Sequence, residues 1–136
     1  MSTLVINELK GLDASGSITV TAEGGSITTN LQQGLTKFRS MHSGDSPTVD
    51  DSLNQSSLDD ISAGNYRYNF TNNFSNGFYT PSALSTEDAS IGYVVMYYSR
   101  NYSTRASNDL ELNGIDHGNQ YDDGRWTSVQ STGDLA

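Results

Sequence analysis

The stretch that decides the fold is Asp51-Ser52-Leu53-Asn54-Gln55-Ser56-Ser57-Leu58-Asp59-Asp60-Ile61, followed shortly by Gly64-Asn65-Tyr66-Arg67-Tyr68-Asn69-Phe70-Thr71. The first part is polar and turn-rich. The second part alternates: Tyr66, Tyr68 and Phe70 fall on one face, and Asn65, Arg67, Asn69 and Thr71 fall on the other. This period of two residues is typical of a half-buried β-strand. The stretch therefore predicts a β-protein.

The composition predicts a thin hydrophobic core. The chain has 136 residues, of which 34% are hydrophobic and 17% are charged. Even when glycine is allowed for, this is below the about 45–50% apolar residues of usual globular chains, so burial within an oligomer or a larger assembly is favoured. Ser, Thr, Asn and Gly supply most of the polarity, and they suit turns and β-structure. We expect an N-terminal β arm or hairpin over residues 1–30 and a β-sandwich domain over residues 31–136.

The charge and the cysteine count exclude several kinds of site. The net charge is −9, which disfavours a nucleic-acid partner because phosphate binding needs clustered Lys and Arg. The chain has no cysteine, so disulfides and thiolate metal sites are excluded. Neither a signal peptide nor a run long enough to span a membrane is visible, so no membrane partner is expected.

The N-terminal third predicts a strand, a hairpin and one helix. Residues 4–9 form a plausible first strand. Gly16-Ser17-Ile18-Thr19 recurs as Gly25-Ser26-Ile27-Thr28 after a glycine-rich turn, which indicates a hairpin. Residues 30–38 are the helix candidate, because Asn30 could cap it and the apolar residues have helical spacing. Gly34 weakens that helix, and residues 37–42 could instead continue as a strand.

The remainder reads as short strands between turns, which predicts an antiparallel β-sandwich or a barrel-like domain. Residues 78–80 begin a strand that Pro81 ends or pushes to a sheet edge. Residues 93–98 are apolar on both faces, as expected of a central strand or of one at a subunit interface. Further strands are expected at 107–112 and 125–130. We expect a homotrimer, whose interface, or whose contact with a larger assembly, uses Leu4, Val5, Ile6, Tyr93, Val95 and Tyr97.

The sequence predicts no catalytic, cofactor-binding or metal-binding residue. A Ser-His-Asp arrangement would need His42 or His117, the only histidines, and no Gly-x-Ser-x-Gly turn is present. The Asp116–Gly124 segment could wrap Ca²⁺, or could be a solvated turn, which we favour. Asp50-Asp51 and Asp59-Asp60 could pair for glycoside chemistry, but such acids are more often surface residues.

The aromatic residues are the other candidate for function. Eight Tyr and one Trp could present a face that binds a carbohydrate or a protein. Tyr98, Tyr102 and Tyr121 follow or precede turns and are the best candidates for exposure. The alternation already explains Tyr66, Tyr68 and Phe70 as core residues, so a structural role is favoured.

An ordered set of motifs resembles a family of small tail-fibre and virion structural proteins of marine bacteriophages, especially those that infect cyanobacteria. The resemblance spans most of the chain and rests on residues 1–9, 31–37, 51–57, 64–71, 72–79 and 133–136. No single motif is specific. The chain departs from the family where a Trp-containing apolar strand is replaced by the more polar residues 38–42.

The resemblance implies a non-enzymatic structural protein of the virion, with no catalytic residues to carry over. A capsid decoration or head-fibre protein is the first expectation, because the chain is short and shows no long fibre shaft. A tail-fibre or receptor-binding protein that recognises a host surface glycan is the alternative, and a glycan hydrolase ranks below both. The expected partners are other virion proteins, either the major capsid protein or tail components.

Overall fold

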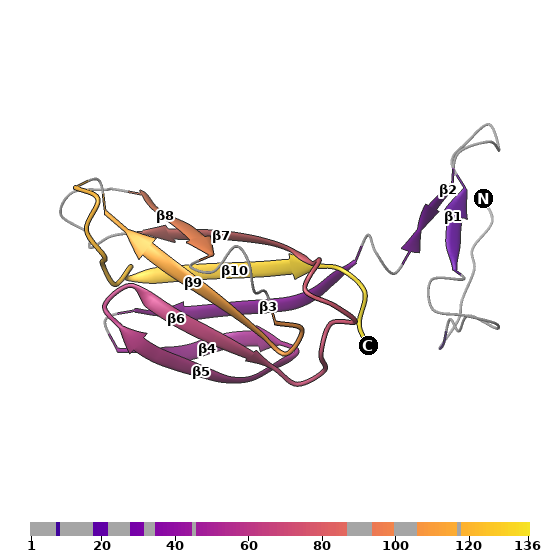
Figure 1. Cartoon of the computed structure of the whole chain (residues 1–136), viewed down its shortest axis with the longest axis horizontal. Helices are drawn as coiled ribbons and strands as arrows, with labels where there is room; N and C mark the ends of the chain where they lie inside the picture. The colour runs from indigo at the N-terminus through magenta and orange to yellow at the C-terminus, as the bar shows by residue number, and fades with distance from the viewer. Residues whose placement is uncertain are drawn as a thin grey trace, which may run out of the picture. The chain divides into compact units, whose positions relative to one another are not determined.

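The computed structural model describes residues 8, 18–21, 28–31, 35–44, 46–86, 94–99, 106–116 and 118–136 (Figure 1). The chain divides into two compact units, Met1–Leu35 and Thr36–Ala136. In the first unit, β1 (Thr19–Thr21) pairs antiparallel with β2 (Thr28–Asn30), with Val20 opposite Thr29. These two strands agree with the predicted hairpin. The strand expected over residues 4–9 lies outside the described residues, apart from Glu8.

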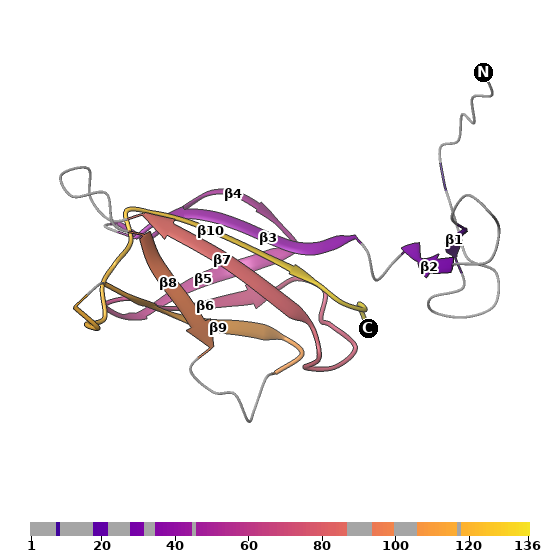
Figure 2. The same cartoon turned by 90° about the horizontal axis from the view of Figure 1, so that it is seen from above.

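The second unit is an antiparallel β-sandwich, as predicted (Figure 2). Its strands are β3 (Thr36–Ser43), β4 (Thr48–Leu53), β5 (Gln55–Ser62), β6 (Asn65–Phe70), β7 (Thr80–Thr86), β8 (Val94–Ser99), β9 (Asp109–Ile115) and β10 (Trp126–Thr132). They pair in the order β4-β3-β10-β7-β8-β9-β6-β5. The β4-β3-β10-β7 half packs on the β9-β6-β5 half, and β8 joins the two.

Strand β6 supplies the centre of the core, in the register that the alternation predicts. Tyr66 and Tyr68 are fully buried and Phe70 is nearly so, while Arg67 and Asn69 are partly exposed. Phe38 of β3 crosses from the opposite layer, with ring centroids 5.8 Å from Tyr68 and 5.0 Å from Phe70. Interlocked aromatic rings therefore hold the two layers together.

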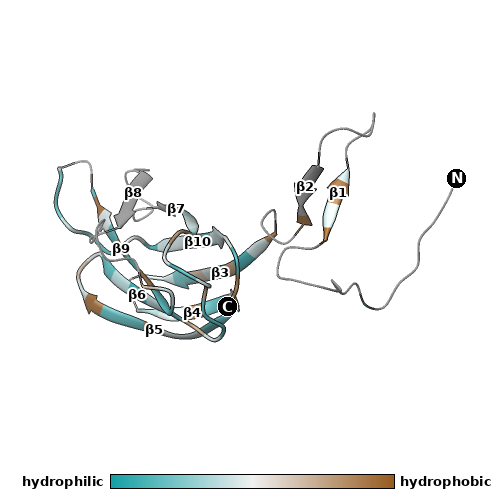
Figure 3. Cartoon of the chain, turned by 45° about the vertical axis from the view of Figure 1, so that its right-hand side comes forward, coloured by the Kyte–Doolittle hydropathy of each residue, from teal (hydrophilic) through white to brown (hydrophobic). Residues whose placement is uncertain are grey.

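The rest of the core is small, as the composition predicts. Phe74 and Tyr79 pack edge-on against Phe70, and Leu110, Leu112 and Val129 complete the buried apolar set. Most of the sandwich ribbon is teal or pale when coloured by hydropathy, with isolated brown residues (Figure 3). A thin core leaves several large apolar side chains exposed.

The polar run before β6 forms two strands and is not the turn-rich lead that its composition predicts. β4 is exposed along its whole length, and β5 is mostly exposed. They are the two ends of the pairing order, so each has one strand partner, β3 or β6. Edge strands need few apolar residues because their pairing is set by the inner neighbour. The polar composition of β4 and β5 therefore did not reveal that they are strands.

Asn54 is the single residue between these strands, and it turns the chain from one layer to the other. Its φ of 61° lies in the left-handed region, which Asn tolerates better than most residues. Its side-chain oxygen accepts a hydrogen bond from the Asn72 backbone N–H at 2.7 Å, and its Nδ2 donates to the Asn72 carbonyl at 2.9 Å. The turn is thus fixed to the segment after β6.

We expect Asn54→Ala to lower the free energy of unfolding by about 1–2 kcal/mol, because it loses both contacts and strains the backbone. Asn54→Gly removes the strain but not the lost contacts, so it should fall between wild type and Asn54→Ala. Urea unfolding of the three proteins measures both effects. Equal midpoints for wild type and Asn54→Ala would show that the turn does not depend on this side chain.

The helix predicted over residues 30–38 is wrong at both ends, because Asn30 ends β2 and residues 36–38 lie in a strand. Residues 36–38 begin β3, and the described residues contain no helical element beyond an isolated position at Leu31. Phe38, Ser40 and His42 all point into the core with a period of two. The helical spacing of the apolar residues was a coincidence of a short segment, which tertiary packing overrode.

Pro81 lies within β7 and does not end it. It pairs with Ser131 of β10, whereas among the described residues of β7 only Ser85 and Thr86 pair with β8. Pro81 therefore lies where β7 has no second partner, which is where a strand tolerates proline. The strands expected near residues 93–98, 107–112 and 125–130 are confirmed as β8, β9 and β10.

Candidate functional site

The predicted interface residues fall mostly outside the described part of the chain. Leu4, Val5, Ile6 and Tyr93 are not described. Val95 pairs with Ser85 of β7, and Tyr97 pairs with Gly114 of β9. Strand β8 thus lies inside the pairing order, between β7 and β9. Its role at a subunit interface stays a prediction.

His42 lies in the interior and does not face solvent. Its exposed fraction is 0%, and its ring lies 4.7 Å from the ring of Tyr66 and 5.6 Å from that of Tyr68. Burial lowers the pKa of His42 to about 4, although Asp50 and Asp123 act in the opposite direction. The imidazole is therefore neutral at pH 7 and closed off from ligands in solution.

Asp123 joins the Asp116–Gly124 segment to the end of the sandwich. Its Oδ1 accepts hydrogen bonds from the Tyr66 hydroxyl at 2.7 Å and from the Gly64 N–H at 2.6 Å. Gly64 has a φ of 65°, and a Cβ there would lie 2.6 Å from the Gly114 carbonyl oxygen. This carboxylate therefore has a structural task in a tight corner that only glycine fits.

Hydrogen bonds also join Asp116, Asn119 and Gln120 of this segment. Asp116 accepts the Gln120 N–H on its side chain at 2.7 Å and the Asn119 N–H on its carbonyl at 3.1 Å. Within the described residues, no three acidic or histidine side chains group in a way that could hold a metal ion. In this segment the Asp116 and Asp123 carboxylates each accept hydrogen bonds from the chain itself.

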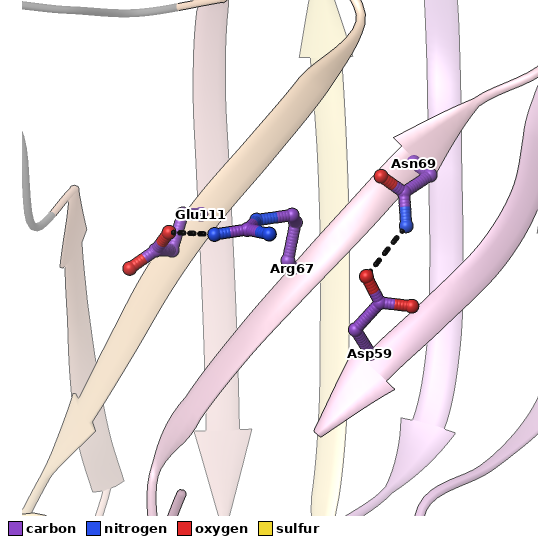
Figure 4. A network of polar contacts seen from close by, with 4 residues as sticks. All are labelled: Asp59, Arg67, Asn69 and Glu111. Atoms are coloured by element: carbon purple, nitrogen blue, oxygen red, sulfur yellow. Dashed lines mark hydrogen bonds and ion pairs between the residues drawn. The ribbon is translucent and has the colours of Figure 1, made fainter. Parts of the chain in front are cut away.

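One acid of each pair, Asp51 in β4 and Asp59 in β5, binds a neighbouring side chain of the chain itself. Asp51 forms an ion pair with Arg39 at 2.6 Å. On the other layer, Asp59 accepts from Asn69 at 3.0 Å, and Arg67 forms an ion pair with Glu111 at 3.0 Å (Figure 4). The bond to Glu111 raises the pKa of Arg67. These side chains fasten adjacent strands across the sheet surface.

The strongest candidate for a binding surface is the outer side of β4-β3-β10-β7, which we call the open face. Along β3, β7 and β10 its side chains alternate with buried or half-buried ones, whereas β4 is exposed along its whole length. They are Arg39 and Met41 of β3, Asp51 and Leu53 of β4, Ser82, Leu84 and Thr86 of β7, and Trp126, Ser128 and Gln130 of β10. Leu84 is 70% exposed and Trp126 is 49% exposed. Large apolar side chains at such exposure mark a surface suited to a partner.

An open groove of about 370 Å³ lies on this face over β7 and β10, lined by Ser82, Ala83, Leu84, Ser128 and Gln130. Its volume is within the range of about 300–1,000 Å³ that ligand sites usually have. The lining combines an aliphatic side chain with hydroxyls and an amide, and it carries no charge. Such a lining suits an uncharged ligand that offers both apolar surface and hydroxyl groups.

Sequence reasoning missed the open face because its residues come from four separate strands. The alternation of Trp126, Ser128 and Gln130 with Thr127, Val129 and Ser131 was the available signal. It shows that Trp126 shares a face with polar residues, but not which strands lie beside it. Of the tyrosines expected to be exposed, Tyr121 is exposed at 54%. Tyr102 is outside the described residues.

Comparisons with protein-family models, with curated proteins and with solved structures find no match to this chain. Among the residues that the structure describes, no helix is both long enough and apolar enough to cross a membrane.

Proposed function

We propose that the chain is a non-enzymatic structural protein of a bacteriophage virion, with a capsid decoration or head-fibre protein as the first candidate. The ordered resemblance of its motifs to small phage virion proteins is one support. The observation that carries the proposal furthest is the open face, on which Met41, Leu53, Leu84 and Trp126 are left exposed although the core itself is thin. Large apolar side chains left on a sheet face are expected where a subunit presents that face to another molecule, here a virion protein or a host ligand.

The proposed assembly is a homotrimer attached to other virion proteins. Its interface would use the N-terminal Leu4, Val5 and Ile6, together with Tyr93 and the β8 residues Val95 and Tyr97. An unpaired strand gains backbone hydrogen bonds when it adds to a neighbour's sheet. The net charge of −9 argues against nucleic acid as the partner.

We expect sedimentation of the purified chain at micromolar concentration to show a trimer. A chain that lacks residues 2–9 should keep its β-sandwich, because Thr36–Ala136 is a compact unit of its own, but should not trimerise. Circular dichroism reports the fold, and sedimentation reports the assembly. A well-folded full-length monomer would count against the trimer.

Electron microscopy of phage particles labelled with an antibody to the chain tests the location. Label on the shell supports the capsid decoration or head-fibre role. Label on the tail supports a tail-fibre or receptor-binding role, which is the second candidate. Mass spectrometry that finds no trace of the chain in purified particles of the phage that encodes it would overturn the virion proposal.

The second candidate is a tail-fibre or receptor-binding protein that recognises a host surface glycan. The observation that favours it is specific: an exposed tryptophan, Trp126, lies on the same strand face as two residues of an uncharged groove. Aromatic rings and hydroxyl-bonding side chains together are a common means of holding sugars. A glycan hydrolase ranks below both candidates, and release of sugar from polysaccharides by the chain would revive it.

A further inference from the structure

We propose that the groove on the open face binds an uncharged glycan chain, with Trp126 as the surface on which a sugar ring stacks. This inference rests on the second candidate function and names the site and the ligand class. It does not depend on where in the virion the chain lies, because a subunit of the head or of the tail could present the same face.

The strand register brings the parts of this site together. Ser128 of β10 lies directly between Met41 of β3 and Leu84 of β7. Trp126 is two residues away on the same face, so it is the diagonal neighbour of both Met41 and Leu84. Diagonal neighbours are about 7–8 Å apart, which is within reach of an aromatic ring. Trp126, Leu84 and Met41 therefore surround Ser128 on one continuous surface and are not three scattered exposures.

The groove continues this surface along β10. Trp126, Ser128 and Gln130 point outward in succession, and four residues of extended strand cover roughly 13 Å. Ser82 lies opposite Gln130 on β7. The site is thus elongated, with apolar surface at one end and a hydroxyl and an amide at the other, as a short segment of a linear sugar chain requires.

The chemistry of the lining selects sugar hydroxyls. Ser82 and Ser128 can each donate and accept a hydrogen bond, and Gln130 offers two donors and an acceptor. A sugar presents hydroxyls of the same mixed character on its rim and C–H groups on its faces. The C–H groups are attracted to the negative face of an aromatic ring, here that of Trp126.

The electrostatics favour an uncharged ligand. The charged side chains beside the groove, Arg39 and Asp51, form an ion pair at 2.6 Å, so that their opposite charges offset each other. The groove lining has no charge, and the chain as a whole carries −9. A negatively charged glycan would be repelled by that field without a free cation in the groove to hold it.

The hollow shape favours a glycan over a second protein surface. A flat sheet face that packs on another protein is expected to be apolar at its centre and polar at its rim. Here Ser128 lies at the centre, between Met41 and Leu84, and the surface is hollowed over β7 and β10. A protein partner would bury that hydroxyl and the Gln130 amide, whereas sugar hydroxyls satisfy them.

Trp126 is the only tryptophan of the chain, so its fluorescence reports directly on the site. The full-length protein is titrated with oligosaccharides of glucose, mannose and galactose, and separately with oligosaccharides of a uronic acid. We expect at least one uncharged oligosaccharide to shift the Trp126 emission to shorter wavelength in a saturable way. The uronic acid series should leave the emission unchanged. Calorimetry on the same pair gives the affinity.

Variants that keep the fluorescent reporter locate the groove. Gln130→Ala and Leu84→Ala should each weaken binding several-fold, by loss of a hydrogen bond or of apolar contact. Trp126→Ala, followed by calorimetry, should weaken it about tenfold or more. Tyr121→Ala and Arg67→Ala are matched controls, since they are exposed or partly exposed residues away from the open face, and they should bind as wild type does. All five side chains are at least partly exposed, and thermal unfolding checks that each variant is folded.

Three results would overturn the proposal. The first is that no uncharged oligosaccharide shifts the Trp126 emission or releases heat on binding. The second is that Gln130→Ala and Leu84→Ala bind the oligosaccharide as tightly as wild type does. The third is that the Trp126 emission changes with protein concentration in the absence of any sugar. If the third result is found and the Trp126→Ala oligomer also dissociates more readily in sedimentation, the open face is a contact between copies of the chain. Failure of the glycan site leaves the virion role intact, because electron microscopy of the particles decides that role separately.

Discussion

Replacing Phe70 with alanine is expected to lower the free energy of unfolding by about 3–5 kcal/mol, the usual cost of removing a buried aromatic ring. Phe70 contacts Phe38, Phe74 and Tyr79, with ring centroids 5.0, 5.0 and 5.8 Å away. In so thin a core the surrounding rings have few neighbours that could move in to fill the cavity. Urea unfolding followed by tyrosine fluorescence or circular dichroism measures the loss.

Arg67→Ala is the matched control for Phe70→Ala, because the two residues lie on opposite faces of β6. The Arg67–Glu111 ion pair lies on the sheet surface, and exposed pairs contribute about 0–1 kcal/mol. We therefore expect a small shift. The acidic partner of Arg67 is Glu111 of the same chain. If the two variants lose equal stability, the register of β6 is not the one described.

The β6 register could be predicted from sequence because one face of this strand is fully buried and the other is not. A slip by one residue would expose Tyr66, Tyr68 and Phe70 together, so the pattern fixes the face. Edge strands β4 and β5 have no such contrast. Their polar residues are compatible with a strand as well as with a turn. These segments are strands because they pair with β3 and β6.

Buried polar residues also escape prediction from a single sequence. Asn65 was expected on the outward face of β6, yet it is 2% exposed, opposite the fully buried Asn113 of β9. Both lie at the end of the sandwich where Gly64 and Asp123 close the corner. Alternation specifies which way a side chain points but not whether a loop later covers it. The open face could not be predicted from sequence either, because four strands must be aligned before its residues become neighbours.

Acidification is expected to destabilise the fold through His42. The imidazole has a pKa of about 4 in the folded chain and about 6.5 when unfolded. At pH 7 it is neutral in both states. Between these two values the unfolded chain binds a proton that the folded chain does not, so stability falls as the pH falls through this window. Below pH 4 both states are protonated and the loss levels off, at on the order of 3 kcal/mol.

His42→Phe isolates this contribution, because phenylalanine keeps a ring against Tyr66 and Tyr68 but does not titrate. Unfolding free energies of both proteins are measured from pH 7 to pH 4. Carboxylates titrate in both, so the difference between the two curves reports His42 alone, and we expect wild type to fall more steeply below pH 6.5. NMR of the imidazole protons gives a second readout, in which His42 should stay neutral well below the pH at which a histidine ordinarily titrates. Parallel stability curves, or an NMR titration midpoint near 6.5, would mean that the His42 ring reaches water and that the two layers do not close over it as described.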